Sequence, residues 1–368
     1  MATINNMASL MFAPETNRIT VSNPTDVAVR IKVTTRDNVV RYDQASTYTP
    51  VSGVIEFGDL GDLINKCILL TSDLKSPFGL STIYPYATLQ ITAGSTTSTA
   101  TVYYCTAGNA TGVSQFCIFP TQLRKRKVLA DQQYCMVWLP QLTALAGASV
   151  TVVGTYVSGS TQSTATYTTS ITGTSGAFTL LNLTPARVKS LCGISSSATL
   201  YEYTANIWIN GVLYDSIQFT IDRRNYPQHA EMLFLNTFGL PESVMLRGRE
   251  EESHSLEAEF GYNGWLLCRL DDETVRDFRS NTGWLSKAEC RQYGELYRSP
   301  VTAKKEELGL RRVVIREIDV AYNTPSNEPR SFDVTWRYAD RREEWFADLD
   351  PNTAGHNIFD STFAITFD

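Results

Sequence analysis

Short runs of β-branched and aromatic residues, separated by turn-forming pairs, recur through the first 222 positions of the chain. Between these runs we find no helical hydrophobic period, apart from one or two helical turns expected between Gly58 and Lys66. Strands at this spacing predict antiparallel sandwich domains. The expected strands are 18–21, 27–33, 54–57, 86–92, 100–106, 115–119, 134–139, 149–156, 164–172, 177–181, 199–209 and 212–221.

One turn is especially well marked. Asn210-Gly211 lies between two β-rich segments, and Asn-Gly flanked by such segments is the strongest short-range hairpin signal because both residues tolerate a positive φ. We therefore expect strands 199–209 and 212–221 to be neighbours in one sheet.

The last third of the chain mixes a helix with strands. Ser286 is followed three positions later by Glu289, which is the spacing of a capping box, and the predicted helix ends at Ser299-Pro300. Two strands follow, 311–320 and 331–338, and the second alternates apolar with polar residues. Segments 232–238 and 243–246 are expected to form two strands, or a strand and a turn.

The final residues have an apolar pattern that a free chain end would leave exposed to water. Burial of each large side chain gains roughly 1.5 to 3 kcal/mol. This strand either folds back on its own domain or adds to the sheet edge of a neighbouring subunit. The second interpretation makes an interface of Ile358, Phe359, Phe363, Ile365 and Phe367.

At 368 residues the chain is long enough for two or three domains, and its composition changes from Ser, Thr, Gly and Val to Arg, Glu, Asp and Trp after about Asp222. The predicted fold class is therefore mostly β, with two Ig-like β-sandwich domains, an α+β domain with one capped helix, and an extended tail. The expected boundaries are 1–139, a Ser/Thr-rich 140–222, a platform domain 223–345, and a C-terminal extension strand 346–368.

Charge and cysteine content exclude several classes of protein. The net charge of -6 disfavours a nucleic-acid partner, and the basic run 124–127 is interpreted as a solvated linker or the charged rim of an interface. Seven cysteines without CxxC spacing indicate buried thiols formed in a reducing cytoplasm, and no membrane insertion is expected. The Tyr-Tyr-Cys end of 100–105 resembles an immunoglobulin strand, but no tryptophan precedes Trp138, so no antibody-type disulfide is expected.

Catalytic chemistry has no clear anchor in this sequence. His229, His254 and His356 form no metal-ligand spacing, and no nucleotide-binding or nucleophile-elbow motif occurs. We therefore expect no enzyme, no cofactor and no metal. A glycoside hydrolase built on the carboxylates of 250–252 or 271–273 is the alternative from the enzyme class, although adjacent acids more often form a solvated turn.

Several segments together resemble a known group of proteins. They are 234–242 (FLNTFGLPE), 281–289 (NTGWLSKAE) leading to Ser299-Pro300, and 358–363 (IFDSTF), with a looser likeness at 115–120 and 131–140. In these pieces and their order the chain resembles uncharacterised tail- and baseplate-associated structural proteins of Bacteroidetes phages and prophages. It departs from that group in the acidic stretch 249–255 and in its Ser/Thr-rich second domain.

The resemblance implies a virion structural protein, made in the bacterial host cytoplasm and assembled into the tail with copies of itself and other tail proteins. It implies neither a receptor nor a position in the tail. The alternative from the binding class is a module that recognises a host-surface glycan through stacking tyrosines, for which the candidates are Tyr84, Tyr86, Tyr201 and Tyr203.

Overall fold

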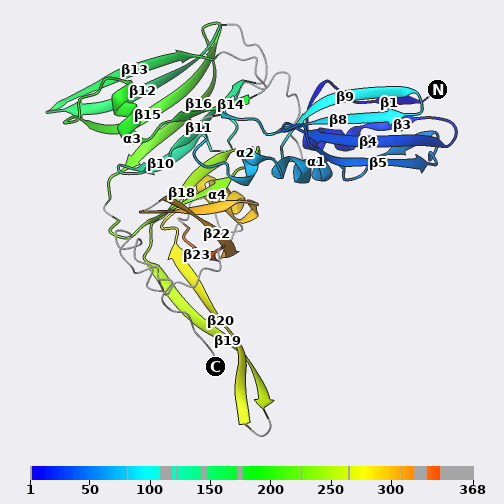
Figure 1. Ribbon diagram of the computed structural model, residues 1–368. Coiled ribbons are helices and arrows are strands. Elements are labelled where there is room, and N and C mark those ends of the chain that lie inside the picture. Colours follow the sequence, from blue (N-terminus) through cyan, green and yellow to red (C-terminus); the bar gives the residue numbers. More distant parts are fainter. Residues whose placement is uncertain are drawn as a thin grey trace, which may run out of the picture.

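The computed structural model describes residues 2–80, 82–107, 118–121, 123–141, 147–171, 177–224, 226–263, 266–307, 309–318 and 330–339, with the backbone alone for 141 and 255–275. These residues form a mostly β protein with five sheets, sandwich-like domains and few helices, which confirms the predicted class at this level (Figure 1).

The first domain packs a five-stranded sheet, a three-stranded sheet and helix α1 around one core. Valine and isoleucine alternate with polar residues along β4, so one face of that strand is buried and the other is wet. Helix α1 covers β4 and β8, and it extends through Leu69, beyond the one or two turns expected. The elements are β1 (Thr3–Asn5), β2 (Leu10–Phe12), η1 (Ala13–Arg18), β3 (Thr20–Ser22), β4 (Val27–Thr35), β5 (Val40–Tyr48), β6 (Val54–Glu56), α1 (Leu60–Leu69), α2 (Ser72–Lys75), β8 (Tyr86–Ala93) and β9 (Thr96–Tyr103).

The second domain contains the Asn-Gly hairpin that the sequence predicts. Asn210 and Gly211 both adopt positive φ, 50° and 79°, and β15 pairs antiparallel with β16. The five-stranded sheet has the order β10-β16-β15-β12-β13. Its strands are β10 (Lys125–Leu129), β12 (Ala148–Ser158), β13 (Thr161–Ser170), β15 (Thr199–Ile209) and β16 (Val212–Asp222), and helix α3 (Pro185–Leu191) packs on β12 and β15.

A small sheet joins the first two domains. It consists of β11 (Met136–Gln141), β14 (Ala177–Asn182) and β7 (Thr82–Ile83), in the order β11-β14-β7. Alternation along β11 places Trp138 in the core of the first domain and Val137 and Leu139 in the core of the second. Both faces of this sheet are therefore buried. One face packs in the core of the first domain and the other in the core of the second domain.

The third domain is a seven-stranded sheet with the order β18-β17-β21-β22-β23-β20-β19 and helix α4 on one face. The predicted capping box is confirmed. The Ser286 hydroxyl accepts a hydrogen bond from the backbone N–H of Glu289, and the Glu289 carboxylate accepts one from the backbone N–H of Ser286. The elements are β17 (Ala230–Leu235), β18 (Pro241–Leu246), β19 (Glu250–Asn263), β20 (Leu266–Asn281), α4 (Lys287–Arg298), β21 (Thr302–Glu306), β22 (Gly309–Ile318) and β23 (Asp333–Tyr338).

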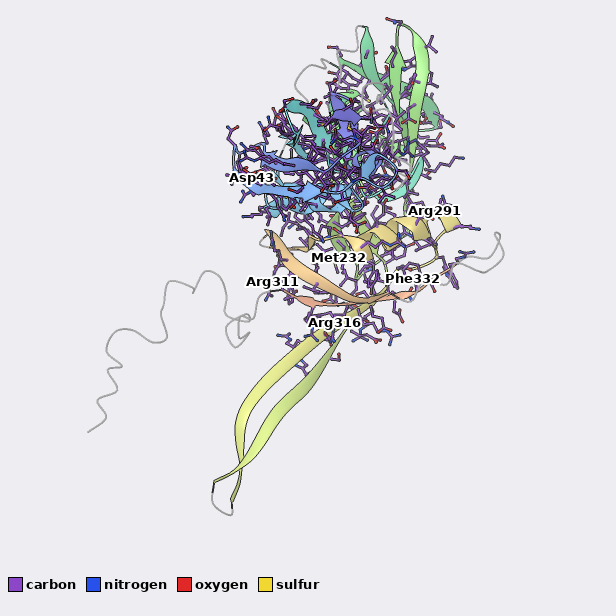
Figure 2. All side chains as sticks on the ribbon, turned by 90° about the vertical axis from the view of Figure 1, so that its right-hand side faces the viewer. Asp43, Met232, Arg291, Arg311, Arg316 and Phe332 are labelled. Carbon is purple, nitrogen blue, oxygen red and sulfur yellow. The ribbon has the colours of Figure 1, made fainter. Side chains whose placement is uncertain are left out.

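Strands β19 and β20 form a long two-stranded ribbon that projects from the body of the protein (Figures 1 and 2). The solvated turn expected at 271–273 is wrong, because these residues lie within β20 and pair with β19. The linker interpretation of 124–127 is also wrong, because Lys125–Leu129 pair in parallel with β16. In both cases partners distant in the sequence supply the backbone hydrogen bonds that local composition does not predict.

Candidate functional site at the domain junction

The interface residues predicted from the sequence lie outside the described residues. These are Ile358, Phe359, Phe363, Ile365 and Phe367, so strand addition by the tail stays a prediction. His356 also lies outside this range, while His229 and His254 are partly exposed and lie near Asp131 and Glu252 respectively.

The tyrosines proposed for glycan stacking are only partly available. Tyr203 is fully buried, stacks on Phe219 and donates its hydroxyl proton to the Leu183 carbonyl, so it belongs to the core. Tyr201 is 43% exposed with the Arg223 guanidinium over its ring. The face of Tyr84 is likewise covered by a guanidinium, and Tyr86 packs against Tyr103.

A buried charge network instead marks the place where the second and third domains meet. Glu242 in β18 is 1% exposed and accepts hydrogen bonds from Arg126 at 2.7 Å, Asn236 at 2.7 Å and Gln292 at 3.1 Å. Arg126 comes from β10 of the second domain, whereas Gln292 lies on α4. Arg126, the second arginine of the basic run 124–127, therefore belongs to an interface between domains. Its exposed fraction is 8%, and it forms an ion pair with Glu242.

A second set of hydrogen bonds runs beside the first. Glu231 in β17 accepts the backbone N–H groups of Gln133 and Tyr134, and Ser243 donates to the Tyr134 carbonyl at 2.5 Å. Gln132 donates to the Ser243 hydroxyl. Burial raises the pKa of Glu231 to about 7, against the lowering effect of these hydrogen bonds.

The first domain reaches the same junction through an indole and a tight turn. Trp138 donates its indole N–H to the Pro241 carbonyl at 2.7 Å. Gly239, between β17 and β18, has φ of 71°, and a Cβ there would approach the Tyr104 ring to 2.8 Å. A residue with a side chain at this position would push the first domain away from the turn.

An open cleft of about 500 Å³ lies where the first domain meets helix α4. Glu295 accepts a hydrogen bond from Thr237, and burial, with the nearby Glu242 charge, raises the pKa of Glu295 to about 7. Two arginines of the helix, Arg291 and Arg298, also line this cleft. The full lining is Tyr104, Thr106, Ala107, Leu235, Asn236, Thr237, Arg291, Gly294, Glu295, Arg298, Ser299 and Pro300.

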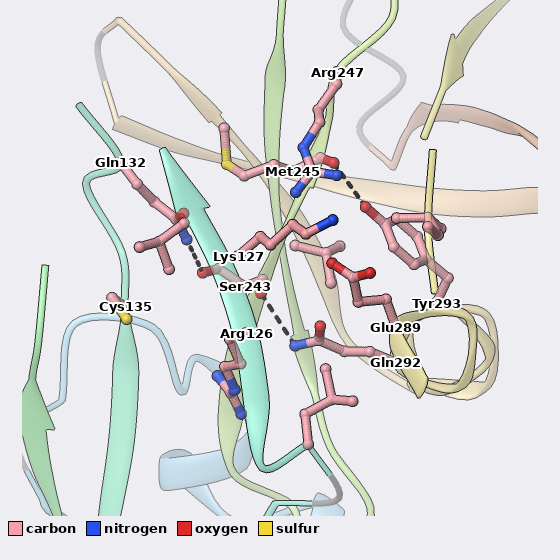
Figure 3. Close-up of a pocket in the computed structure, with 14 residues that line it drawn as sticks. Arg126, Lys127, Gln132, Cys135, Ser243, Met245, Arg247, Glu289, Gln292 and Tyr293 are labelled. Carbon is pink, nitrogen blue, oxygen red and sulfur yellow. Dashed lines mark hydrogen bonds between the residues drawn. The ribbon is translucent and has the colours of Figure 1, made fainter. Parts of the chain in front are cut away.

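A second, smaller cavity lies between β10, β18 and α4 (Figure 3). Its volume is about 30 Å³, and Arg126, Lys127, Arg247 and Glu289 bring charge to its wall. Arg247 is 8% exposed, and its Nε and Nη1 atoms have no hydrogen-bond partner.

Reactive groups suited to catalysis are scarce among the described side chains. Cys105 and Cys135 are buried free thiols, and desolvation raises their pKa values to about 12 and about 11, which keeps them protonated and unreactive. Within the described ranges no group of three or more His, Cys, Asp or Glu residues is arranged to hold a metal ion. The helices in the described part of the chain are all too short or too polar to span a bilayer.

Comparisons with known proteins leave the family open. The chain matches no protein-family model and no curated protein. A solved structure described as "Crystal structure of CBD12 from CALX1.2" is 6% identical, covering 56% of this chain and 78% of that chain at a TM-score of 0.20. Another, "Crystal structure of calcium binding domain CBD12 of CALX1.1", is 8% identical, covering 60% of this chain and all of that one at a TM-score of 0.18. At TM-scores this low neither similarity bears on function.

Proposed function

We propose that this chain is a structural protein of a phage tail or baseplate, which assembles through its projecting ribbon and its C-terminal strand with copies of itself and other virion proteins. The two N-terminal domains act as Ig-like sandwiches in this proposal. The observation that carries the proposal is the ribbon of β19 and β20, hereafter called the arm.

The arm is long and pairs with few other strands, so we do not expect it to be stable on its own. Only Phe278–Asn281 of β20 pair with β23, and in the described residues the segment 266–277 pairs with β19 alone. At about 3.3 Å per residue this segment reaches roughly 40 Å. A two-stranded ribbon in water is marginally stable at best, and its outer edges carry unpaired backbone groups. A partner that covers the arm removes both costs.

The buried junction supports the other half of the proposal. A protein that transmits load within a virion needs domains fixed relative to one another. Here Glu242, Glu231 and Trp138 link the domains through buried hydrogen bonds. The body then acts as a rigid base from which the arm projects.

The test is to shorten the arm and measure assembly. In the variant, residues 255–275 are replaced by Asn-Gly, so that His254 and Arg276, already paired, flank a two-residue turn. We expect a folded monomer with near-normal stability and a loss of oligomers in native mass spectrometry. A separate variant lacking 355–368 tests the predicted tail contact by the same measurement.

The matched control places the same Asn-Gly turn between Val157 and Gln162 at the tip of the β12–β13 hairpin, which should leave assembly intact. Antibodies raised against the chain should also label the tails of purified phage particles. Full oligomers from the arm-shortened chain would disprove the role of the arm, and unlabelled tails would disprove the virion role.

A further inference from the structure

We infer that the open cleft between the first domain and helix α4 is the docking site for the C-terminal segment 358–368 of a second copy of this chain. The inference rests on the proposed function, because it names the place at which the C-terminal strand joins a neighbouring copy. In this contact, phenylalanine rings of the segment enter the cleft and Asp360 pairs with an arginine of α4.

The cleft has the volume and the apolar surface that such a segment needs. Its volume of about 500 Å³ lies within the range of roughly 300–1,000 Å³ that is usual for pockets that bury a ligand of drug size. An aromatic side chain with its neighbours in an extended segment is of this size. Tyr104, Ala107 and Leu235 bring apolar surface to the wall, and so does Pro300, just beyond the end of α4.

The charge of the cleft favours an acidic occupant. Arg291 and Arg298 are exposed and lie seven positions, about two turns, apart, which places them on the same side of α4. Figure 2 labels Arg291 on this helix, below the first domain. Within the described part of the chain neither arginine forms an ion pair. Burial raises the pKa of Glu295 to about 7, so this carboxyl group does not cancel both positive charges near neutral pH.

The C-terminal segment has the complementary composition. Residues 346–368 contain four aspartates and neither lysine nor arginine. Within 358–368 the acidic residues are Asp360 and Asp368, and the large apolar ones are Ile358, Phe359, Phe363, Ile365 and Phe367. Aromatic residues and arginine are enriched where proteins meet, because both bury large contact areas and arginine also pairs with carboxylates.

The direction of β23 favours a second copy over the same chain. β21 and β23 are both antiparallel to β22, so they run parallel to one another. β21 begins at Thr302, two positions after Pro300 in the cleft wall, and runs away from the cleft. β23 therefore leads the chain away from its own cleft. A segment from a neighbouring copy needs no reversal of direction to reach it.

The direct test is photo-cross-linking in the full chain, with a benzophenone amino acid in place of Phe363. Isotopically heavy and light chains are mixed, and the cross-linked peptides are mapped by mass spectrometry. We expect heavy-to-light cross-links within 104–107, 235–237 and 291–300. The same amino acid in place of Val51, which is 80% exposed on the first domain, is the control and should give none of them.

The outcomes separate this inference from the proposed function. An oligomer whose cross-links fall outside the cleft, or only within one chain, would overturn the inference and leave the proposed function in place. A chain that is monomeric in native mass spectrometry would overturn both.

The second test reverses charge in the cleft. Arg291→Glu with Arg298→Glu should weaken association at least about tenfold, because like charges that face each other across an interface oppose binding. Adding Asp360→Arg to this double variant should restore part of the affinity. Arg187→Glu, at an exposed position of α3, is the matched control and should leave association unchanged. Association of the double variant equal to that of the control would contradict the inference.

Discussion

At the scale of single residues, Glu242 shows how one side chain can hold two domains together. It is almost fully buried, and it accepts hydrogen bonds from a strand of the second domain and from a helix of the third. Removing a carboxylate from water is expensive, and only close, hydrogen-bonded partners offset that cost. The contribution of Glu242 therefore depends on Arg126 remaining opposite it.

We expect Glu242→Gln to lower the free energy of unfolding by about 3–5 kcal/mol, because it leaves the Arg126 guanidinium buried without a charge partner. Urea denaturation followed by fluorescence measures this loss. The control is Asp43→Asn, which removes the exposed pair of Arg30 and Asp43 on the outside of the first domain (Figure 2). Water screens that pair, so its loss should leave the stability nearly unchanged. Similar effects of the two substitutions would show that the Glu242 network contributes little.

At the scale of elements, a local signal determines where helix α4 begins, and packing against the sheet determines its position in the fold. Ser286 and Glu289 close the first turn, while Tyr293 and Leu296 are buried in the core of the third domain. The helix also supplies Gln292 to the Glu242 network and Glu295 to the open cleft. A change at its first turn therefore acts on both the core and the junction.

Ser286→Ala should destabilise the protein by about 1 kcal/mol, because the Glu289 amide loses its acceptor. Thermal unfolding measured by calorimetry is the appropriate readout. Lys287→Ala, one position further and exposed, is the matched control and should have little effect. If Ser286→Ala is as stable as that control, the capping box is not what starts this helix.

At the scale of the whole molecule, the domains are joined by groups whose charge depends on pH. Glu231 binds backbone amides of the second domain, and burial raises its pKa from 4.5 to about 7. Between pH 4.5 and pH 7 the carboxyl group of Glu231 is therefore protonated in the folded chain. In the unfolded chain the same group loses its proton near pH 4.5. The contribution to stability is complete below pH 4.5 and is lost as the pH rises toward 7.

We expect the free energy of unfolding to fall by about 3 kcal/mol through Glu231 alone as the pH rises across this interval, because the pKa difference is about 2.5 and each unit corresponds to about 1.4 kcal/mol. Glu295 acts with the same sign. Glu231→Gln cannot titrate, so its unfolding curve should depend less on pH than that of the unmodified protein. Parallel pH profiles for the two proteins would mean that Glu231 keeps an ordinary pKa in the fold.

Local signals in the sequence predicted the parts that depend on neighbouring residues. The hairpin at Asn210-Gly211, the capping box of Ser286 and Glu289, and the alternation of Val334 and Trp336 in β23 are all confirmed. The arm was missed because its acidic composition is typical of a turn. The junction was missed because Arg126 and Glu242 are 116 positions apart, and no spacing relates them.

The sequence alone determined that this chain is mostly β, where its best-marked turn lies and where its capped helix begins, since these features follow from steric and hydrogen-bonding preferences within a few residues. Only the tertiary structure decided that β7 crosses from the first domain to pair with β14, that a basic run becomes part of a strand in which Arg126 is buried, and that the arm projects from the third domain. Those outcomes depend on desolvation and on strand pairing between segments that are distant in the sequence. These interactions contribute to stability only when the folded chain brings the segments together.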